Sequence, residues 1–461
     1  MTDVSTAATG RAAFDGQADI AARIERLPIT RRVLWARNII GAATFFDGYT
    51  VLAIAYAMPV LVREWGLSPA QTGAILSAGY LGQLIGAVTF GALAERYGRL
   101  PVLFATLVLF VSMDIACLWA WDATSMIAMR FVQGIGTGGE VPVASAYINE
   151  LIGAKKRGRF FLLYEVMFLF GLLGAGLIGY ELVPVFGWRA MFVVGLVPAV
   201  LMIPLRFFMS ESPRWLASRG RWQDADRIVS ALERSVTERG GSLLPPFPGA
   251  VRAPTARGDW RELFSPVYRK RTLMIWALWF CSYFLANGTI TWLPTLYRET
   301  FHLPLQTSLG YGFLTSLAGV VASVVCALSI DRVGRKRWYA AAFTLAILPL
   351  LALFGLGATS ALEVLLLAGL AYAIVQTITF SLYLYSAELY PTRLRAIGTG
   401  VGSAWLRLGS SAGPVVVGWV IAGLGIGYVF AMFAGVLLVG ALITAAFAVE
   451  TKGRVLEELS P

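Results

Sequence analysis

The sequence predicts an all-α membrane protein with twelve transmembrane helices in two six-helix repeats. Of its 461 residues, 57% are hydrophobic and only 14% are charged, and the mean hydropathy is +0.69. Soluble globular proteins carry roughly a quarter charged and under half apolar residues, which disfavours an ordinary soluble enzyme. The chain also contains a series of apolar stretches of about 20 residues, each long enough to cross a bilayer as a helix.

The apolar stretches and the breaks between them give the order of the elements. We expect transmembrane helices at about 34–62, 70–93, 101–121, 124–149, 160–183, 189–209, 272–297, 307–330, 338–357, 361–387, 397–422 and 426–449. The longest break contains a Gly- and Pro-rich piece, which is typical of a linker. The expected parts are an N-terminal tail (1–33), a six-helix bundle (34–209), a linker (210–271), a second six-helix bundle (272–449) and a C-terminal tail (450–461).

Basic residues gather in one set of loops, which predicts the topology. One set of alternate loops holds twelve Lys and Arg residues, and the other set holds three. Loops rich in Lys and Arg stay in the cytoplasm. The larger set is Arg96, Arg99, Lys155, Lys156, Arg157, Arg159, Arg332, Arg335, Lys336, Arg337, Arg393 and Arg395. Both termini and the linker are therefore expected in the cytoplasm, in a multi-pass protein of the cell (inner) membrane. This topology accounts for the net charge of +11, so no nucleic-acid partner is expected.

Charged motifs recur at a nearly constant spacing in the two halves. The offsets are 331 − 95 = 236, 388 − 150 = 238 and 450 − 211 = 239. The recurring pairs are Glu95-Arg96-Tyr97-Gly98-Arg99 with Asp331-Arg332-Val333-Gly334-Arg335, Glu150…Arg157 with Glu388…Arg395, and Glu211-Ser212-Pro213-Arg214 with Glu450-Thr451-Lys452-Gly453-Arg454. Three landmarks at similar offsets indicate a duplicated six-helix unit.

At these motifs the chain resembles the major facilitator superfamily, over essentially residues 34–454. Residues 91–99 resemble the motif between the second and third helices of that superfamily, and residues 130–139 resemble its fourth-helix motif. Residues 211–216 and 450–454 resemble the sugar-porter supergroup, which also includes niacin-type and synaptic-vesicle-2-like carriers. The resemblance implies transport by alternating access.

Three departures from the hexose porters narrow the expected substrate. Cys281-Ser282 replaces the usual Gln-Gln pair, although Asn287 is retained five residues after Ser282. Glu165 replaces the sugar-binding Gln of the fifth helix, as in niacin-type carriers. Residues 405–414 resemble organic-anion and aromatic-acid carriers, in which the arginine at this position, here Arg407, faces the substrate. By resemblance, this is an organic-anion carrier.

Arg407 also stands out on physical grounds. It lies about ten residues into its expected helix, roughly 15 Å from the cytoplasmic face. A charged group near the bilayer centre costs about 3 kcal/mol on insertion scales, and arginine keeps its proton there. Its planar guanidinium matches a carboxylate in a bidentate pair. We therefore expect Arg407 to hold the substrate carboxylate, with a permanent salt bridge as the alternative.

Other polar residues within the spans are candidates for proton coupling. Asp47 is expected to carry the proton, with Arg130 as its candidate partner, because a buried carboxyl can be poised between its charged and neutral states. A purely structural bridge between these two residues is the alternative. Glu140 and Glu165 are expected to form a second proton or gating site, or else salt bridges to loop arginines. Asp114 is assigned no role, because the third helix tends to be peripheral in this fold.

Aromatic and amide side chains of the second half are expected to contact the substrate ring, with helix packing as the alternative. The candidates are Tyr283, Asn287 and Trp292 on the seventh helix, and Gln376 and Tyr383 on the tenth. The duplicated charges are expected to form cytoplasmic gate clusters. These comprise Glu95, Arg96, Arg99, Glu150 and Arg157 in the first half, and Asp331, Arg332, Arg335, Glu388 and Arg395 in the second.

The functional hypothesis is proton-coupled symport of a small organic anion, an aromatic or heteroaromatic carboxylate, by a monomer. We expect no cofactor other than the coupling proton, because Cys117, Cys281 and Cys326 lie in apolar runs and His302 is the single histidine. No nucleophile–base pair converges at one depth, so an enzyme is not expected. The alternatives are a sugar or other metabolite carrier or uniporter of the same superfamily, and a membrane sensor with a transporter-like fold.

Overall fold

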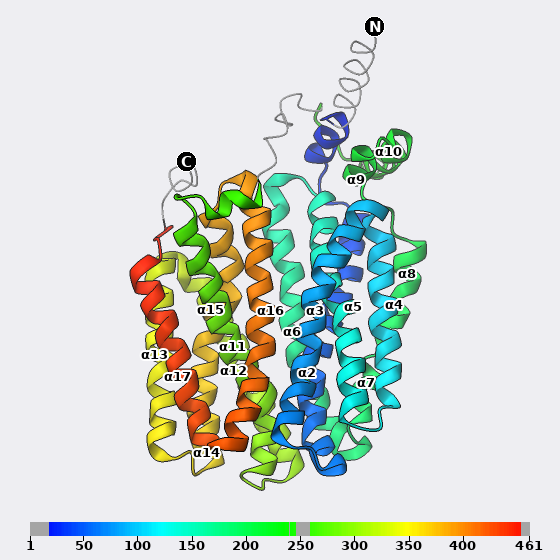
Figure 1. Ribbon diagram of the computed structural model, residues 1–461. Coiled ribbons are helices and arrows are strands. Elements are labelled where there is room, and N and C mark those ends of the chain that lie inside the picture. The colour runs from blue at the N-terminus through cyan, green and yellow to red at the C-terminus, as the bar shows by residue number, and fades with distance from the viewer. Residues whose placement is uncertain (1–17, 239, 246–258, 453–461) are drawn as a thin grey trace.

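The protein consists of two helical bundles side by side, one from each half of the chain (Figure 1). The computed structural model describes residues 18–238, 240–245 and 259–452, apart from the side chains at 154–163, 165, 204, 206, 392, 393 and 396. No strand occurs in these residues. Both described ends of the chain lie at the same end of the molecule, which agrees with an even number of crossings in each half. The predicted all-α fold is confirmed.

The N-terminal bundle contains five long helices and one interrupted span. The long helices are α2 (Arg31–Trp65), α3 (Pro69–Tyr97), α4 (Arg99–Leu118), α5 (Ala123–Glu150) and α6 (Ala154–Phe186). The sixth span, expected as one helix at 189–209, is divided into α7 (Arg189–Val194), the 3₁₀ turn η1 (Val197–Leu201) and α8 (Met202–Phe207). Pro198 lies within this interruption, where its missing N–H removes a helical hydrogen bond.

The C-terminal bundle repeats this plan. Its helices are α11 (Arg269–Glu299), α12 (Leu305–Val333), α13 (Arg335–Leu356), α14 (Ala361–Glu363) continued by the π-helical turn η3 (Val364–Ala368) and α15 (Gly369–Leu389), α16 (Thr392–Gly423) and α17 (Ile426–Phe447). Within the described residues, ten helices are long and apolar enough to cross a membrane. The polar helix α5 and the interrupted sixth span complete a twelve-helix arrangement.

Glycines close the two loops that carry the repeated charged motif. Gly98 joins α3 to α4 and Gly334 joins α12 to α13, with φ angles of 110° and 98° that favour glycine. A Cβ on either glycine would lie 2.4 Å from a carboxylate oxygen, of Glu211 or Glu450 respectively. Each loop therefore has room for one acidic side chain, which comes from the segment just after the last helix of the same bundle.

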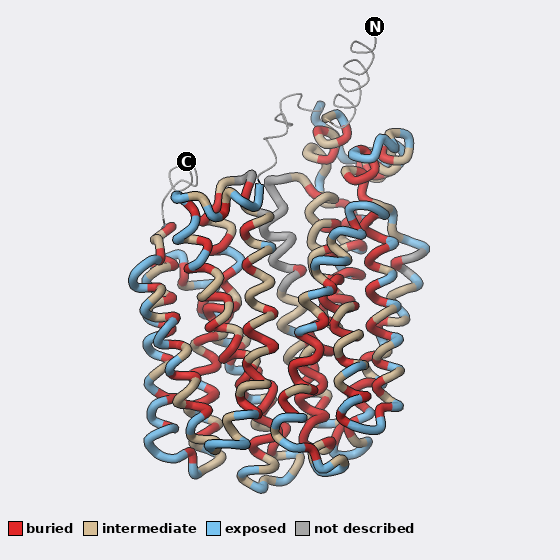
Figure 2. The backbone as a smooth tube through the Cα atoms, viewed as in Figure 1, coloured by how far each residue is buried: buried red, intermediate tan, exposed pale blue. Residues whose placement is uncertain are grey.

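The linker is partly helical and lies against the N-terminal bundle. It contains α9 (Pro213–Ser218) and α10 (Trp222–Thr237), beyond the end of the bundle where the chain begins (Figure 1). Arg23 ties the described N-terminal helix to α10 through Glu233, at 2.8 Å. Buried residues run along the inward sides of the helices, whereas exposed ones occupy their outer faces (Figure 2). Those outer faces carry many large apolar side chains, as expected for contact with lipid.

Candidate functional site

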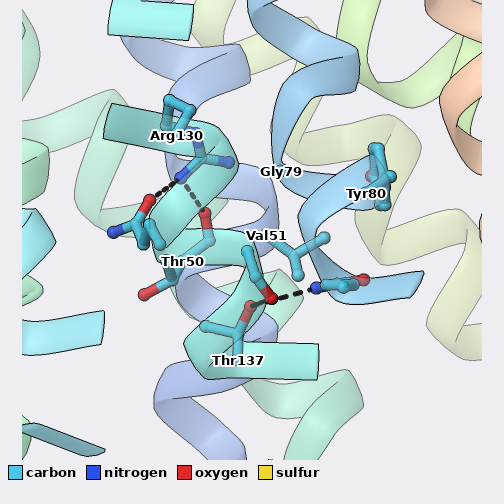
Figure 3. A pocket seen from close by; sticks show the side chains of 9 residues that line it. Thr50, Val51, Gly79, Tyr80, Arg130 and Thr137 are labelled. Atoms are coloured by element: carbon cyan, nitrogen blue, oxygen red, sulfur yellow. Dashed lines mark hydrogen bonds between the residues drawn. The ribbon is translucent and has the colours of Figure 1, made fainter. Parts of the chain in front are cut away.

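Arg130 of α5 anchors a buried polar network in the N-terminal bundle (Figure 3). Its Nη1 donates hydrogen bonds to Gln133 Oε1 and, at 3.3 Å, to the carbonyl oxygen of Thr50 in α2. Gln133 Nε2 donates in turn to Asp114 Oδ1 of α4, at 2.6 Å. Arg130 is 4% exposed, and Gln133 and Asp114 are each 1% exposed. The network therefore joins a cation, an amide and a carboxylate from α4 and α5 inside the bundle.

A small polar cavity lies beside Arg130. It leaves about 10 Å³ for the centre of a water molecule, which is close to the minimum for a single water. Gly79 allows Arg130 to approach the backbone of α3, because a Cβ there would lie 3.2 Å from Nη2. The lining residues come from α2, α3 and α5, and are Thr50, Val51, Gly79, Tyr80, Gln83, Arg130, Gln133, Gly134 and Thr137 (Figure 3).

No role was assigned to Asp114 from the sequence, and the structure places it at the end of this network, where it accepts a hydrogen bond from Gln133. It faces the interruption of the sixth span, where a Cβ on Gly195 would lie 2.9 Å from the carboxylate atoms. Its Oδ2 is buried without a hydrogen-bond partner among the described residues. A signal was present in the sequence, because a carboxylate within a membrane span is costly unless it faces the interior of the bundle. The structure confirms this placement: Phe110 and Cys117, four residues before and three after Asp114, are fully buried on the same face of α4.

The sequence left open whether Asp47 pairs with Arg130. Both are buried, but among the described residues no hydrogen bond or ion pair joins them. Asp47 lies on α2 one helical turn from Thr44, whose hydroxyl donates to Glu140 Oε1 at 3.1 Å. The Thr44 hydroxyl also lies 2.9 Å from that of Tyr164. A second buried polar cluster therefore links α2, α5 and α6.

Arg407 lies near the middle of α16 and is 7% exposed. Its Nη1 donates to Ser403 of the preceding turn, at 3.0 Å to the carbonyl oxygen and 3.3 Å to the hydroxyl. Its Nε is buried without a hydrogen-bond partner, and no acidic side chain forms an ion pair with it in the described part of the chain. Arg407 is therefore a buried cation whose recorded partners are neutral oxygens of its own helix.

Two of the predicted aromatic residues converge on Trp279 of α11. Tyr283 stacks on it with ring centroids 5.5 Å apart, and Tyr383 of α15 meets it edge-on at 4.7 Å. Tyr383 remains 40% exposed although it lies within a transmembrane helix. Trp279 itself is fixed by a hydrogen bond from its Nε1 to Ser386, at 3.0 Å. The three rings form an aromatic group in which Trp279 is buried, Tyr283 is partly exposed and Tyr383 is exposed.

Asn287 connects this bundle to the other one. Its Oδ1 accepts a hydrogen bond from Tyr80 of α3 at 2.7 Å, and its Nδ2 donates to Ser410 of α16 at 2.9 Å. Ser410 lies one turn from Arg407, and Tyr80 lines the cavity beside Arg130. This polar contact between the halves thus lies beside the cavity of Arg130 and one helical turn along α16 from Arg407.

The remaining two predicted contact residues make packing interactions in this structure. Trp292 donates its Nε1–H to the carbonyl oxygen of Pro414 at 2.9 Å, which fastens α11 to α16. Gln376 of α15 lies against Gly319 of α12, where a Cβ would be 3.3 Å from its Cγ. Neither contact tests a role in substrate binding.

The duplicated charges form one ion-pair cluster in each half. Arg99 binds Glu95 at 2.8 Å and Glu150 at 2.9 Å. At the corresponding positions, Arg335 binds Asp331 at 2.7 Å and Glu388 at 2.9 Å. Of the other residues proposed for these clusters, Arg96 lies over the ring of Tyr97, the carbonyl oxygen of Arg332 accepts from Lys452, and the carbonyl oxygen of Arg395 accepts from Thr399. Arg157 and Glu165 lie outside the described side chains.

Each cluster is completed by an acid that the sequence identified only as a repeat landmark. Glu211 accepts the Leu100 N–H at 3.1 Å, and Glu450 accepts the Arg335 N–H at 2.9 Å. Burial raises the pKa of Glu211 above its usual value despite these backbone donors. Burial also acts on Glu450, but backbone donors led by the Lys452 N–H outweigh it and lower its pKa. The two clusters therefore share a geometry, but the pKa of the completing acid is raised in the first half and lowered in the second.

Three side-chain hydrogen bonds and ion pairs join the described parts of the two bundles, all in the half of the molecule remote from the chain ends. They are an Arg63–Glu299 ion pair at 2.7 Å, the Tyr80–Asn287 hydrogen bond, and a Tyr56–Ser316 hydroxyl contact at 3.4 Å. Helices α3 and α16 also touch there, because a Cβ on Gly73 would lie 2.6 Å from the carbonyl oxygen of Pro414. The bundles are therefore fastened together at that end.

Comparisons with known proteins agree with this architecture. A family model described as "Sugar (and other) transporter" matches residues 38–461. The chain is 34% identical over 448 residues to the niacin transporter NiaP of Acinetobacter baylyi, covering 96% of this chain and 99% of the relative. It is 30% identical over 467 residues to the 4-hydroxybenzoate transporter PcaK of the same organism, covering 97% and 96%.

A third curated relative and a solved structure extend the comparison. The gallate transporter of Pseudomonas putida is 30% identical over 429 residues, covering 91% of this chain and 92% of the relative. The crystal structure of a D-xylose-proton symporter superimposes with a TM-score of 0.70 at 18% identity, covering 92% of this chain and 99% of that one, which establishes a shared fold. The chain is a multi-pass membrane transporter, not an enzyme, and it belongs to the sugar (and other) transporter family of the major facilitator superfamily.

Proposed function

We propose that this protein is a proton-coupled symporter of a small aromatic or heteroaromatic carboxylate, placed in the cell (inner) membrane with both termini in the cytoplasm. The observation that carries the proposal is the state of Arg407. It is a buried, permanently charged group, and the described residues supply it with neutral oxygens but no carboxylate. The curated relatives named for niacin, 4-hydroxybenzoate and gallate support an aromatic acid as the missing anion.

The energetic argument for an anionic ligand is direct. A buried cation without an anionic partner is costly, and in a protein interior its attraction to a carboxylate is much stronger than in water. A guanidinium can bind a carboxylate through two parallel hydrogen bonds, and the buried Nε of Arg407 is a donor left over for such a pair. The accessible ring of Tyr383, together with Tyr283, offers a surface on which an aromatic substrate can stack.

The N-terminal bundle supplies carboxyl groups for the coupling proton. Asp47 and Glu140 lie in or next to the cluster around Thr44, while Asp114 is held by Gln133 beside Arg130. Since Tyr80 and Asn287 link the Arg130 cavity to the α16 face near Arg407, a change at one cation can be transmitted to the other. This arrangement supports a coupling site in one half and a substrate anchor in the other.

Alternating access requires that the halves separate at one end at a time. The Arg63–Glu299, Tyr56–Ser316 and Tyr80–Asn287 contacts fasten them at the end remote from the chain termini, which supports an inward-facing arrangement. The Arg99 and Arg335 clusters each lie within a single half, so they are proposed to fix the cytoplasmic ends of their own bundles as gate elements. The transporter is proposed to act as a monomer, with the proton as its only coupling ion.

Uptake by proteoliposomes tests the proposal. Labelled nicotinate and 4-hydroxybenzoate are offered with an inward proton gradient, with xylose and benzylamine as uncharged and cationic controls. Losing a desolvated ion pair costs about 3 kcal/mol, so Arg407→Gln should raise the half-saturating concentration of the acid about a hundredfold. Arg298→Gln, which removes a cation that donates to the Leu303 carbonyl oxygen, should leave uptake unchanged. Xylose uptake without acid uptake would favour the sugar-carrier alternative and overturn the proposal.

A further inference from the structure

A large apolar groove opens on the outer surface of the C-terminal bundle, between α12, α13 and α15. Its volume is about 790 Å³, within the roughly 300–1,000 Å³ of ligand pockets. Its lining includes Leu317, Val321, Val325 and Leu345, which are between 36% and 55% exposed and therefore face the bilayer. Along α12 the groove extends from Leu314 to Val333, about 28 Å of helix. It is long enough to hold an extended acyl chain.

The corresponding seam of the N-terminal bundle is closed by glycines. At an offset of 236, Ala318 and Ala322 of the groove correspond to Gly82 and Gly86 of α3. A Cβ on Gly82 would lie 2.0 Å from the Phe131 carbonyl oxygen, so α3 and α5 touch backbone to backbone. Alanine at both positions of α12 cannot permit that approach to α15. The groove is therefore a specific difference between the repeats, not a general property of the fold.

The end of the groove nearest the chain termini carries basic side chains. Arg332 follows Val325 by seven residues, which places it on the groove face of α12 two turns beyond that lining residue. Arg337 is exposed and precedes Trp338, a lining residue whose Nε1 donates to Thr377 at 3.0 Å. The nearby acid, Asp331, is already bound to Arg335.

The N-terminal repeat has only one of the two basic residues of this rim. At the same offset of 236, it has Pro101 and Val102 in place of Arg337 and Trp338, although Arg96 matches Arg332. An apolar groove that ends in a basic and aromatic rim at the membrane surface matches the two parts of an anionic lipid. The groove and the rim occur together in the same repeat.

We propose that this groove binds an anionic phospholipid, with an acyl chain against α12, α13 and α15 and the phosphate at Arg332 and Arg337. The apolar lining recognises the chain through burial alone, whereas the two guanidinium groups select for the negative headgroup. The site is separate from Arg407 and Arg130, so it does not depend on which substrate is transported.

Native mass spectrometry of the full chain in detergent tests the proposal. Bound lipid is counted during titration with phosphatidylglycerol or with phosphatidylcholine of the same acyl chains. The wild type should reach half-occupancy at about tenfold lower phosphatidylglycerol concentration. Arg332→Gln should weaken phosphatidylglycerol binding about fivefold and leave phosphatidylcholine binding unchanged, whereas Arg96→Gln at the matching N-terminal position should have no effect.

A second pair of variants tests the groove itself. Ala341 lines it and is exposed, so Ala341→Phe should displace one bound lipid of either kind. Ala105 occupies the equivalent, also exposed, position of α4, and Ala105→Phe should bind lipid as the wild type does. Equal binding of both lipids by the wild type would overturn the proposal. Equal effects of Ala341→Phe and Ala105→Phe on lipid binding would also overturn it. A dimer that Ala341→Phe abolishes would overturn it as well, since a second copy of the chain would then occupy the groove.

Discussion

The Arg130–Gln133–Asp114 network makes a quantitative prediction about stability. Asp114→Ala leaves the Arg130 guanidinium, 4% exposed, without the carboxylate that balances it through Gln133. Removing one partner of a buried charge pair costs about 3–5 kcal/mol. Gln133 separates the two charges and Arg130 keeps the Thr50 carbonyl oxygen, which places the expected loss near 3 kcal/mol. Arg130→Met should cost a similar amount, because it leaves Asp114 as the unbalanced group.

Coupling between the two positions distinguishes this network from ordinary packing. The double variant Asp114→Ala/Arg130→Met removes both charges, so it should be more stable than the sum of the single losses by at least about 1 kcal/mol. Unfolding in mixed micelles of increasing sodium dodecyl sulfate, followed by the fluorescence of the 14 tryptophans, measures each free energy. Asp114→Asn, which keeps an acceptor for Gln133, should lie between Asp114→Ala and the wild type. Additive single losses would refute the reasoning.

Three further predictions concern coupling, pH and packing. Asp47→Asn should abolish proton-driven accumulation of substrate while labelled substrate still exchanges, and normal accumulation would place coupling elsewhere. Burial raises the pKa of Glu233 but bonds from Arg23 outweigh it and lower the pKa, so the bridge is complete above about pH 4 and is lost as pH falls through the lowered pKa. The protection of α10 amides from exchange, corrected for the intrinsic exchange rate at each pH, should therefore fall on acidification. It should fall less in Arg23→Gln, which keeps only the Arg26 contact to Glu233. Gly82→Ala should destabilise the protein by about 1–3 kcal/mol, because its Cβ would overlap a carbonyl oxygen of α5. Gly91→Ala is the control and should leave stability unchanged, because its Cβ would meet no neighbouring atom. Thermal unfolding measures both.

The fold could be predicted because long apolar stretches and repeated charged motifs are local signals. Each span that crosses the bilayer must satisfy its own backbone hydrogen bonds, so length and hydropathy suffice to find it. The interruption of the sixth span was missed, although Gly195 and Pro198 were visible in the sequence. Membrane helices often tolerate both residues, so neither one marks a break by itself.

The site was predicted less completely because its partners come from different helices. Arg407 and Arg130 could be identified because burying a charge within a membrane span is costly. This cost is evident from each residue's position in the sequence, without knowledge of its partners. The connections of Arg130 to Asp114 and of Glu140 to Thr44 depend on how helices rotate against one another, and the sequence does not give that rotation. Within the predicted gate cluster, Arg99 binds the acids Glu95 and Glu150, whereas the side chain of Arg157 lies outside the described residues. The functional roles of these residues remain predictions.

The contact between Gly195 and Asp114 has an evolutionary consequence. The carboxylate occupies the space that a Cβ at position 195 would need, so the two positions cannot vary independently. A lineage that replaces the acid by a smaller, apolar side chain becomes free to replace the glycine. Among relatives of this chain, a residue larger than glycine at position 195 is therefore expected to covary with loss of the acid on the third helix.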